Sequence, residues 1–273
     1  MGSGISELSA ATLRELHSER NRPLVLANVW DAASARIVED AGFPAIATSS
    51  AGVAYALGYA DGQQVPPEEM YAAIYRIART VRIPVTADIE AGYGDVAKTA
   101  RALIDAGAVG MNLEDYENDG LVPLDEQLER IAAVKAMGLE AGVPIVINAR
   151  TEIYLANIGD PDSRLERSLE RLQAFARAGA DCLFIPGIKD EPTIERFVQA
   201  LDGPLNILAV AGSPSIARLR ELGVARISVG SGPMRATMAL TRRIAVEMRD
   251  HGTYDAITTD TIAYPDANAL FLR

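Results

Sequence analysis

The sequence predicts an α/β fold, a (β/α)8 TIM barrel formed by a single domain over residues 1–273. Eight short apolar runs have the length and β-branched content of buried parallel strands. An amphipathic stretch with helical spacing follows most of these runs. No linker rich in Pro, Gly and Ser divides the chain. This regular alternation favours a closed barrel over a doubly wound open sheet.

The strand-like runs begin at Leu24, Ala45, Val85, Val109, Ile145, Cys182, Asn206 and Arg226. Between them, apolar residues recur at helical spacing in AASARIVEDAG, PEEMYAAIYRIARTV, LDEQLERIAAVKAMGLEAG and SRLERSLERLQAFARAG. Several of these stretches end in Ala-Gly, the chemistry of a helix C-terminus. Each strand and the helix after it therefore form one repeated unit.

Composition narrows the class of protein. The net charge of −11 argues against a nucleic-acid or anionic-membrane partner, since both need a basic face. The single cysteine, Cys182, excludes a disulfide within the chain and is typical of a reducing compartment. No leader-like segment opens the chain and no apolar run approaches about 18 residues. We therefore expect a soluble, cytoplasmic protein.

The most informative stretch is IPVTADIEAGYGD, from Ile83 to Asp95. Its apolar run ends in two carboxylates, Asp88 and Glu90, and side chains two positions apart on a strand share one face. Two glycines then turn the chain, and Asp95 is placed to cap the next helix. The two acids therefore lie where a strand gives way to a loop, the place where α/β barrels carry their chemistry.

Other predicted strands also end in polar residues. The acids of this set are Asp61, Asp88, Glu90 and Glu114. If they meet at one mouth of the barrel, they cannot all stay ionised without a cation to offset their repulsion. All offer oxygen ligands, with no His or Cys nearby, which favours Mg²⁺ first and Mn²⁺ second.

Four motifs carry a resemblance to a known family: SSAGVAYALGYADG, ADIEAGYGD, NLEDYE and INARTE. In this order they resemble the isocitrate lyase/phosphoenolpyruvate mutase superfamily, which includes methylisocitrate lyases, phosphonopyruvate hydrolases and oxaloacetate decarboxylases. The likeness runs from about Leu24 to Met248. It implies a barrel whose eighth helix is exchanged with a neighbouring subunit in a dimer of dimers, and we expect a homo-oligomer, either a dimer or a tetramer.

The resemblance also implies a metal site. Mg²⁺ would be chelated by a 2-oxo or 2-hydroxy carboxylate, with Asp88 as its direct protein ligand. Asp61, Glu90 and Glu114 would hold water molecules of the ion. Glu90 stands where an Asp is commoner in the family.

The substrate contacts implied by the same resemblance come from two strand ends. Ser49, Ser50 and Ala51 would hold the substrate carboxylate through backbone N–H groups and a hydroxyl. Arg150 would face the developing enolate. We add Asn206, at the start of the seventh run, as a further substrate contact and Glu114 as a catalytic acid.

The chain also departs from the best-defined members. Methylisocitrate and isocitrate lyases carry a Lys-Lys/Arg-Cys-Gly-His loop after the fourth strand, where this chain has YENDGLVPLDEQ, without Cys or His. Phosphonate mutases carry Lys-x-Asn there, and this chain offers Asn118 without the lysine. The nearest likeness is to members whose loop leads into an acidic D/E-x-Q-L-x-R-I helix.

Several reactive residue types are better explained by packing or exposure. His17 and His251 fall in the first and last helical stretches, and Cys182 opens a strand. Lys189 reads as a loop residue. Proton transfer is left to a carboxylate, to water on the ion or to a tyrosine among Tyr59, Tyr93, Tyr116 and Tyr154. Among the tyrosines we favour Tyr93.

These residues predict a lyase: a Mg²⁺-dependent enzyme that cleaves a carbon–carbon bond in a small 2-oxo or 2-hydroxy acid through an enolate-type intermediate. Two alternatives stay open. One is a phosphonopyruvate-type mutase or hydrolase acting on a P–C bond, and the other is a non-catalytic 2-oxo acid binder.

Overall fold

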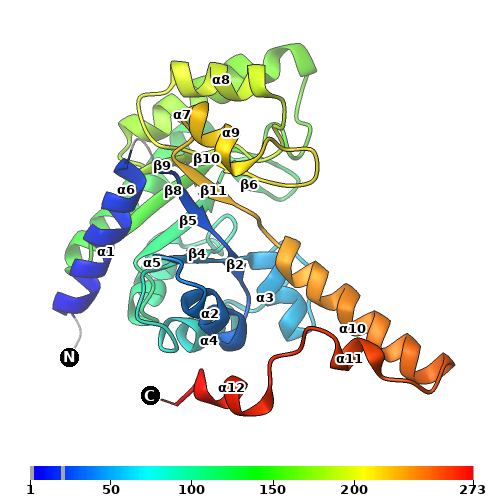
Figure 1. The fold of residues 1–273 in the computed structure, drawn as a ribbon. Helices are drawn as coiled ribbons and strands as arrows, with labels where there is room; N and C mark the ends of the chain where they lie inside the picture. The colour runs from blue at the N-terminus through cyan, green and yellow to red at the C-terminus, as the bar shows by residue number, and fades with distance from the viewer. Residues whose placement is uncertain (1–2, 20–21, 273) are drawn as a thin grey trace.

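The computed structural model describes residues 3–19 and 22–272, so residues 1, 2, 20, 21 and 273 of the expected domain lie outside it (Figure 1). Its main sheet has nine strand segments, and every pairing in it is parallel. Their order around the sheet follows the chain: β1 (Leu24–Leu26) with β2 (Asn28–Val29), β3 (Ile46–Thr48), β4 (Val85–Asp88), β5 (Gly110–Glu114), β8 (Val146–Arg150), β9 (Cys182–Phe184), β10 (Leu205–Leu208) and β11 (Arg226–Ser228). All eight predicted strands are confirmed.

The sheet closes because β1 and β2 are two parts of one strand. β1 pairs with β11, whereas β2 pairs with β3. Asn28 holds this junction: its Nδ2 donates to the carbonyl of Thr48 at 2.9 Å. Its Oδ1 accepts from the backbone N–H groups of Val229 and Gly230 at 2.8 and 2.9 Å. The TIM barrel predicted from the sequence is confirmed.

Helices cover the outside of the barrel (Figure 1). They are α2 (Ala32–Asp40), α4 (Pro67–Ala78), α5 (Val96–Asp105), α6 (Leu124–Glu140), α7 (Arg164–Arg177), α8 (Glu191–Ala200) and α9 (Ile216–Glu221). Asp95 caps α5 as predicted, accepting from the backbone N–H of Lys98 at 3.0 Å. The Ala-Gly endings are also confirmed, for example at Gly42 and Gly107, whose φ angles of 85° and 94° few other residues adopt.

The first helix, α1 (Ser3–Ser18), packs against the amino ends of the strands. Ala10 and Leu13 are fully buried and form one apolar cluster with residues of the barrel interior, including Leu26, Ala47 and Val146. A larger cluster fills the space between the sheet and the outer helices. The amino end of the barrel is therefore plugged, which leaves the carboxyl ends of the strands as the mouth.

The eighth helix of the barrel behaves differently. α10 (Gly232–Asp250) projects away from the barrel, and none of its residues is buried (Figure 1). The chain ends in α11 (Asp255–Thr258) and α12 (Tyr264–Ala269), and Arg36 of α2 donates from Nε to the carbonyl of Leu270. In the described part of the chain, no helix combines the length and apolarity needed to cross a membrane.

The loop after β5 has more structure than its sequence suggested. It forms a small antiparallel hairpin of β6 (Tyr116–Glu117) and β7 (Gly120–Leu121). Asn118 and Asp119 at its tip have φ angles of 52° and 60°, the left-handed backbone of a tight hairpin turn. Arg130 of α6 donates to Glu117 at 2.9 Å and to the carbonyl of Ala91 at 3.5 Å, tying the hairpin to the loop after β4.

We predict that Asn28→Ala destabilises the chain by about 3 kcal/mol. The change leaves three backbone groups at the closing seam without their partner, and each unsatisfied buried group costs about 1–3 kcal/mol. The measurement is urea unfolding at fixed protein concentration. Asn268→Ala, a matched change at an exposed position, should alter stability by less than about 0.5 kcal/mol. Equal stability of the two variants would show that Asn28 does not hold the seam.

Candidate active site

A cavity of about 590 Å³ opens at the mouth of the barrel. Its walls come from the loops that follow β3, β4 and β5, over residues 62–67, 90–94 and 114–119. Glu90, Tyr93 and Glu114, three of the predicted site residues, line it directly. The sequence-based expectation that strand ends converge there holds for these three loops.

Asp88 lies at the last position of β4, almost fully buried, with both carboxylate oxygens bonded by protein groups. Oδ2 accepts from the backbone N–H and the hydroxyl of Ser50, at 3.1 and 2.9 Å. Oδ1 accepts from Nδ2 of Asn112 at 3.1 Å. These bonds fix the carboxylate in one orientation, as a ligand position requires.

Glu90 corrects one detail of the sequence-based interpretation. β4 ends at Asp88, and Glu90 adopts φ 54° in the turn that follows, so the two side chains do not share a strand face. Glu90 nevertheless points back to the cluster, where its Oε2 accepts from the backbone N–H of Gln63 at 2.7 Å. Burial, followed by the charges of Asp61 and Asp88, raises the pKa of Glu90 to about 7.

Arg150 closes β8 between two carboxylates. Its Nη1 lies 3.2 Å from Oε2 of Glu114, and its Nε donates to Glu152. The guanidinium carbon also lies 5.4 Å from the centre of the Phe184 ring. Burial opposes the charge of Arg150, but the two acids outweigh it and raise its pKa. Burial raises the pKa of Glu114, although Arg150 opposes this shift.

Asp61 reaches the same cluster from the loop after α3 (Ser50–Leu57). Its side chain is accessible, yet partial desolvation and the charge of Asp88 raise its pKa. Within the described residues, no three His, Cys, Asp or Glu side chains converge closely enough to hold one ion directly. The donor set nevertheless fits a hard cation held by one carboxylate and through water, because the acids oppose one another's ionisation.

The segment from Ser49 to Ala51 is only partly free to bind a substrate. Oγ of Ser49 caps α3 by accepting from Gly52 at 3.2 Å. Ser50 uses both its backbone N–H and its hydroxyl on Asp88, so the role predicted for it as a carboxylate contact is not available in this arrangement. Ala51 is the second residue of α3, where a backbone N–H has no acceptor within the helix.

Asn206 lies deeper than predicted. It is the second residue of β10, fully buried, and its Oδ1 accepts from the hydroxyl of Ser228 at 3.3 Å. Its Nδ2 has no partner among the described residues. The cavity at the mouth is lined by three other loops, so Asn206 is an interior polar group with one donor unused.

Tyr93 places its ring against Tyr71, with 6.4 Å between ring centres and an edge-to-face angle of 78°. Its hydroxyl is buried and has no hydrogen-bond partner in the described part of the chain. Burial and then the charge of Glu90 raise its pKa. At neutral pH the phenol therefore keeps its proton, which suits a proton donor better than a base.

Left-handed backbone is concentrated around the cavity. Gln63, Glu90, Tyr93, Asn118 and Asp119 all line it, and all have φ between 52° and 60°. Non-glycine residues adopt this conformation at a cost of about 1 kcal/mol or more each. Such strain is typical of functional sites, where the rest of the structure fixes the position of a side chain.

Two residues of the site were not singled out from the sequence. Glu152 is buried beside Arg150, and its backbone N–H donates to Asp115, which pairs with Arg171. Asn112 alternates with Glu114 along β5, a spacing that places both on one strand face and was visible in VGMNLE.

The residues set aside from the sequence lie where packing or exposure was expected. His17 and Cys182 are buried, with a pKa lowered to about 4 and raised to about 12, respectively, in each case mainly by burial. Lys189 is an exposed loop residue that donates to the carbonyl of Ala211 at 3.3 Å. Neither a thiolate nor a buried lysine is therefore offered to the cavity by these positions.

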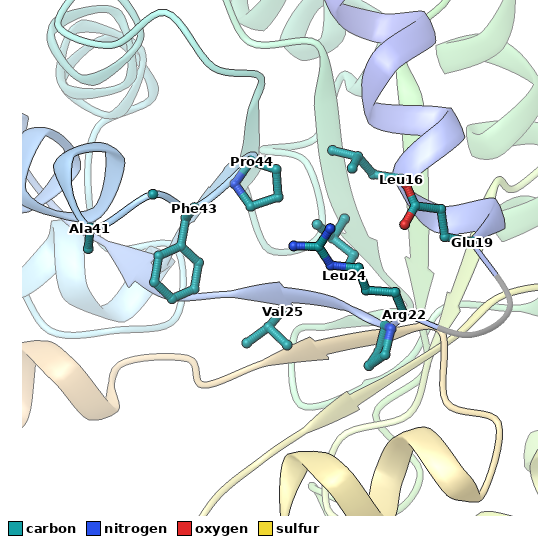
Figure 2. Close-up of a pocket in the computed structure, with 10 residues that line it drawn as sticks. Leu16, Glu19, Arg22, Leu24, Val25, Ala41, Phe43 and Pro44 are labelled. Atoms are coloured by element: carbon teal, nitrogen blue, oxygen red, sulfur yellow. The ribbon is translucent and has the colours of Figure 1, made fainter.

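A second hollow, of about 240 Å³, lies at the opposite end of the strands (Figure 2). Leu16 and Glu19 from the end of α1 form one side, and Phe43 and Pro44 before β3 form another. Val25, on β1, also lines the hollow. The acids of the mouth take no part in this hollow.

A closed parallel barrel with a strained, acid-lined cavity at the carboxyl ends of its strands defines the class of TIM-barrel enzymes. The model of the phosphoenolpyruvate phosphomutase family matches residues 13–249. The chain belongs to this family, within the isocitrate lyase/phosphoenolpyruvate mutase superfamily.

Three relatives illustrate the likeness. A crystal structure from Burkholderia cenocepacia J2315, provisionally described as a phosphonomutase, is 42% identical with a TM-score of 0.83, over 87% of this chain and 98% of that one. Oxaloacetate decarboxylase of Chromohalobacter salexigens is 31% identical over 239 residues, 82% of this chain and 80% of the relative. Oxaloacetate acetylhydrolase, solved with 3,3-difluorooxalacetate, is 28% identical with a TM-score of 0.85, over 96% and 92% of the two chains.

We predict that Glu90 contributes a loss of stability to the metal-free protein as the pH rises from about 4.5 to about 7, whereas the buried His17, with its pKa lowered to about 4, acts in the opposite direction. The folded-state pKa of Glu90 lies above its unfolded value, so the folded state binds more protons in this window. Glu90→Gln removes that penalty and should be more stable than the parent by up to about 3 kcal/mol at pH 8, with no difference near pH 4. Urea unfolding in chelator tests this, and a pH-independent difference would contradict it.

Proposed function

We propose that this protein is a Mg²⁺-dependent carbon–carbon lyase that acts on a small 2-oxo or 2-hydroxy acid through an enolate-type intermediate. The observation that carries the proposal is that two kinds of group lie together at the mouth. One is the cluster of mutually repelling acids around Asp88, and the other is Arg150, which pairs with Glu114 and Glu152. One set of groups suits a divalent cation, and the other stabilises negative charge on the substrate.

In this proposal Asp88 is the direct ligand of Mg²⁺, and Asp61, Glu90 and Glu114 hold its water molecules. Mn²⁺ is the second candidate ion, because the same oxygen donors suit it. When bound, the ion acts as a Lewis acid towards the carbonyl and carboxylate of the substrate. Ser50 and Asn112 contribute by fixing the orientation of Asp88.

The substrate carboxylate is assigned to the start of α3, where Ala51 offers a backbone N–H with no acceptor within the helix. Ser49 and Ser50 precede this position, but their hydrogen bonds with Gly52 and Asp88 make them supports rather than donors to the substrate. Arg150, which pairs with Glu114 and Glu152, stabilises the enolate oxygen in this proposal.

Tyr93 is the proton donor that we propose for the enolate carbon. Its buried hydroxyl has no partner in the described structure, and its raised pKa keeps it protonated. Glu114, whose pKa is also raised, is the second group able to carry a proton. Asn206 would contact the substrate only if a group of the substrate reached the interior of the barrel.

The named relatives agree with this chemistry. Two of them carry oxaloacetate, a 2-oxo acid, in their names. A P–C bond mutase or hydrolase is the second candidate, favoured by Asn118 on the cavity wall and by the relative from Burkholderia. The third candidate, a non-catalytic binder of 2-oxo acids, would use the same Asp and Glu side chains to bind its ligand but would release no product.

Assembly follows from α10. Met238, Leu240, Val246 and Met248 of this helix are exposed apolar side chains. We propose that they pack on another copy of the chain, by exchange of the eighth helix, in a dimer or tetramer.

We also propose that residues 1–273 act as one domain and that the protein works in the cytoplasm, which suits its free, buried Cys182.

The function is tested by a screen of 2-oxo and 2-hydroxy acids for Mg²⁺-dependent release of pyruvate or glyoxylate. We predict turnover by the parent chain, and at least a hundredfold loss of Mg²⁺-dependent oxalate affinity in Asp88→Ala, which lacks the direct ligand. Cys182→Ser, a control at the buried first residue of β9, should keep nearly full turnover.

Phosphate release from a phosphonate substrate would favour the second candidate, and oxalate binding without any turnover would favour the binder. Unchanged oxalate affinity in Asp88→Ala would remove Asp88 from the metal site.

We predict that light scattering gives the mass of a dimer or tetramer at micromolar concentration. Met238→Glu combined with Val246→Glu places charges on the exposed face of α10 and should shift the mass towards the monomer. Leu139→Glu, at an exposed apolar residue of α6, is the matched control and should leave the mass unchanged. A monomeric parent chain would rule out the helix exchange.

A further inference from the structure

Arg226 is a buried cation that the proposed chemistry does not use. It opens β11 and is 1% exposed, within the barrel interior. No carboxylate forms an ion pair with it among the described residues, and its Nε has no partner there. Burial lowers its pKa, and the charge of Asp88 is among the influences that oppose this. A buried charge without a direct counter-ion is costly, which suggests that it has a task.

The two other nitrogens of Arg226 have defined partners. Nη1 lies 3.3 Å from Nε2 of His17, and Nη2 donates to Oδ1 of Asn112 at 3.3 Å. Nδ1 of His17 lies 2.7 Å from the carbonyl of Leu13, which can only accept, so Nδ1 carries the proton. Nε2 of a neutral His17 is then an acceptor for Arg226, in agreement with its pKa of about 4.

Asn112 is fixed by what surrounds it. Its Oδ1 accepts from Arg226 and from Nδ2 of Asn148, the latter at 2.7 Å. An arginine has no acceptor, so this end of the amide must be the oxygen, and Nδ2 must face the other way. Nδ2 of Asn112 then donates to Oδ1 of Asp88 at 3.1 Å.

We propose that Arg226 is a positioning residue for Asp88: it acts through Asn112, whose amide it holds in the one orientation that donates to the carboxylate. This inference rests on the proposed role of Asp88 as the metal ligand. A chain of interior hydrogen bonds therefore connects His17 of α1, at the plugged end of the barrel, through Arg226 and Asn112 to Asp88 at the mouth. The alternative is that Arg226 only fills the interior.

The test is calorimetry of oxalate binding at saturating Mg²⁺. Arg226→Met should weaken oxalate binding about tenfold or more, because Oδ1 of Asn112 then keeps only the Asn148 amide as a donor, and Asn148, whose own Oδ1 has no partner among the described residues, can turn together with Asn112. Arg226→Lys, which restores one donor towards Asn112, should bind within about threefold of the parent. Asn112→Leu should lose as much as Arg226→Met, and the double variant should bind no more weakly than Asn112→Leu alone.

A purely structural role would not produce this pattern. The control is Arg14→Met, which removes a contact with Asp181 near the same end of the barrel and should leave oxalate affinity unchanged. Thermal unfolding checks that each variant is folded, and Arg226→Gln replaces Arg226→Met if the latter does not fold.

Wild-type affinity in a folded Arg226→Met or Arg226→Gln variant would overturn the inference. Independent, multiplying losses in the double variant would also overturn it. A parent chain that binds oxalate equally with and without Mg²⁺ would instead overturn the proposed metal site, and this inference with it.

Discussion

Closure of the barrel between its first and last strands is the constraint on which the site depends. The side chain of Asn28 bonds the strand on each side, and the ladder is split so that β1 meets β11 while β2 meets β3. In a closed parallel barrel all strand ends face one way. Residues from β4, β5 and β8 can therefore surround one small space, although Asp88 and Arg150 are far apart in the chain.

Closure of the barrel assembles a site with two unfavourable features, buried acids close to one another and left-handed backbone at residues other than glycine. Burial, and after it the charges of neighbouring acids, raises the pKa of Glu90, and the loop beside it adopts left-handed backbone at Glu90 and Tyr93. Neither feature is stable by itself. Hydrogen bonds hold these loops in place, including that of Arg130 to the hairpin and that of Gln63 to Glu90, and the latter partly offsets the rise in the pKa of Glu90. A site fixed in this way is ready for a cation and an anionic substrate without rearrangement.

The hairpin after β5 bears on how the site works. In this chain it is short, with Asn118 and Asp119 at a tight turn and Arg130 joining it to the next loop. Hydrogen bonds fix it to the barrel on more than one side, since Val122, just after it, accepts from Arg171 at 2.7 Å. In the proposed reaction, proton transfer then depends on residues of the barrel mouth such as Tyr93, whose buried hydroxyl has no hydrogen-bond partner among the described residues.

The sequence by itself determined the barrel, since strand length, helical spacing and caps such as that of Asp95 are local properties. It also located the acids, because they follow apolar runs directly. It did not determine the direction of Glu90 or the bonding of Ser50 to Asp88. Nor did it reveal that Arg226 reaches Asn112, 114 positions away in the chain. Those features were decided only by the tertiary structure, because a polar side chain takes its partner from whichever strand closure brings beside it, and sequence spacing carries no record of that neighbour.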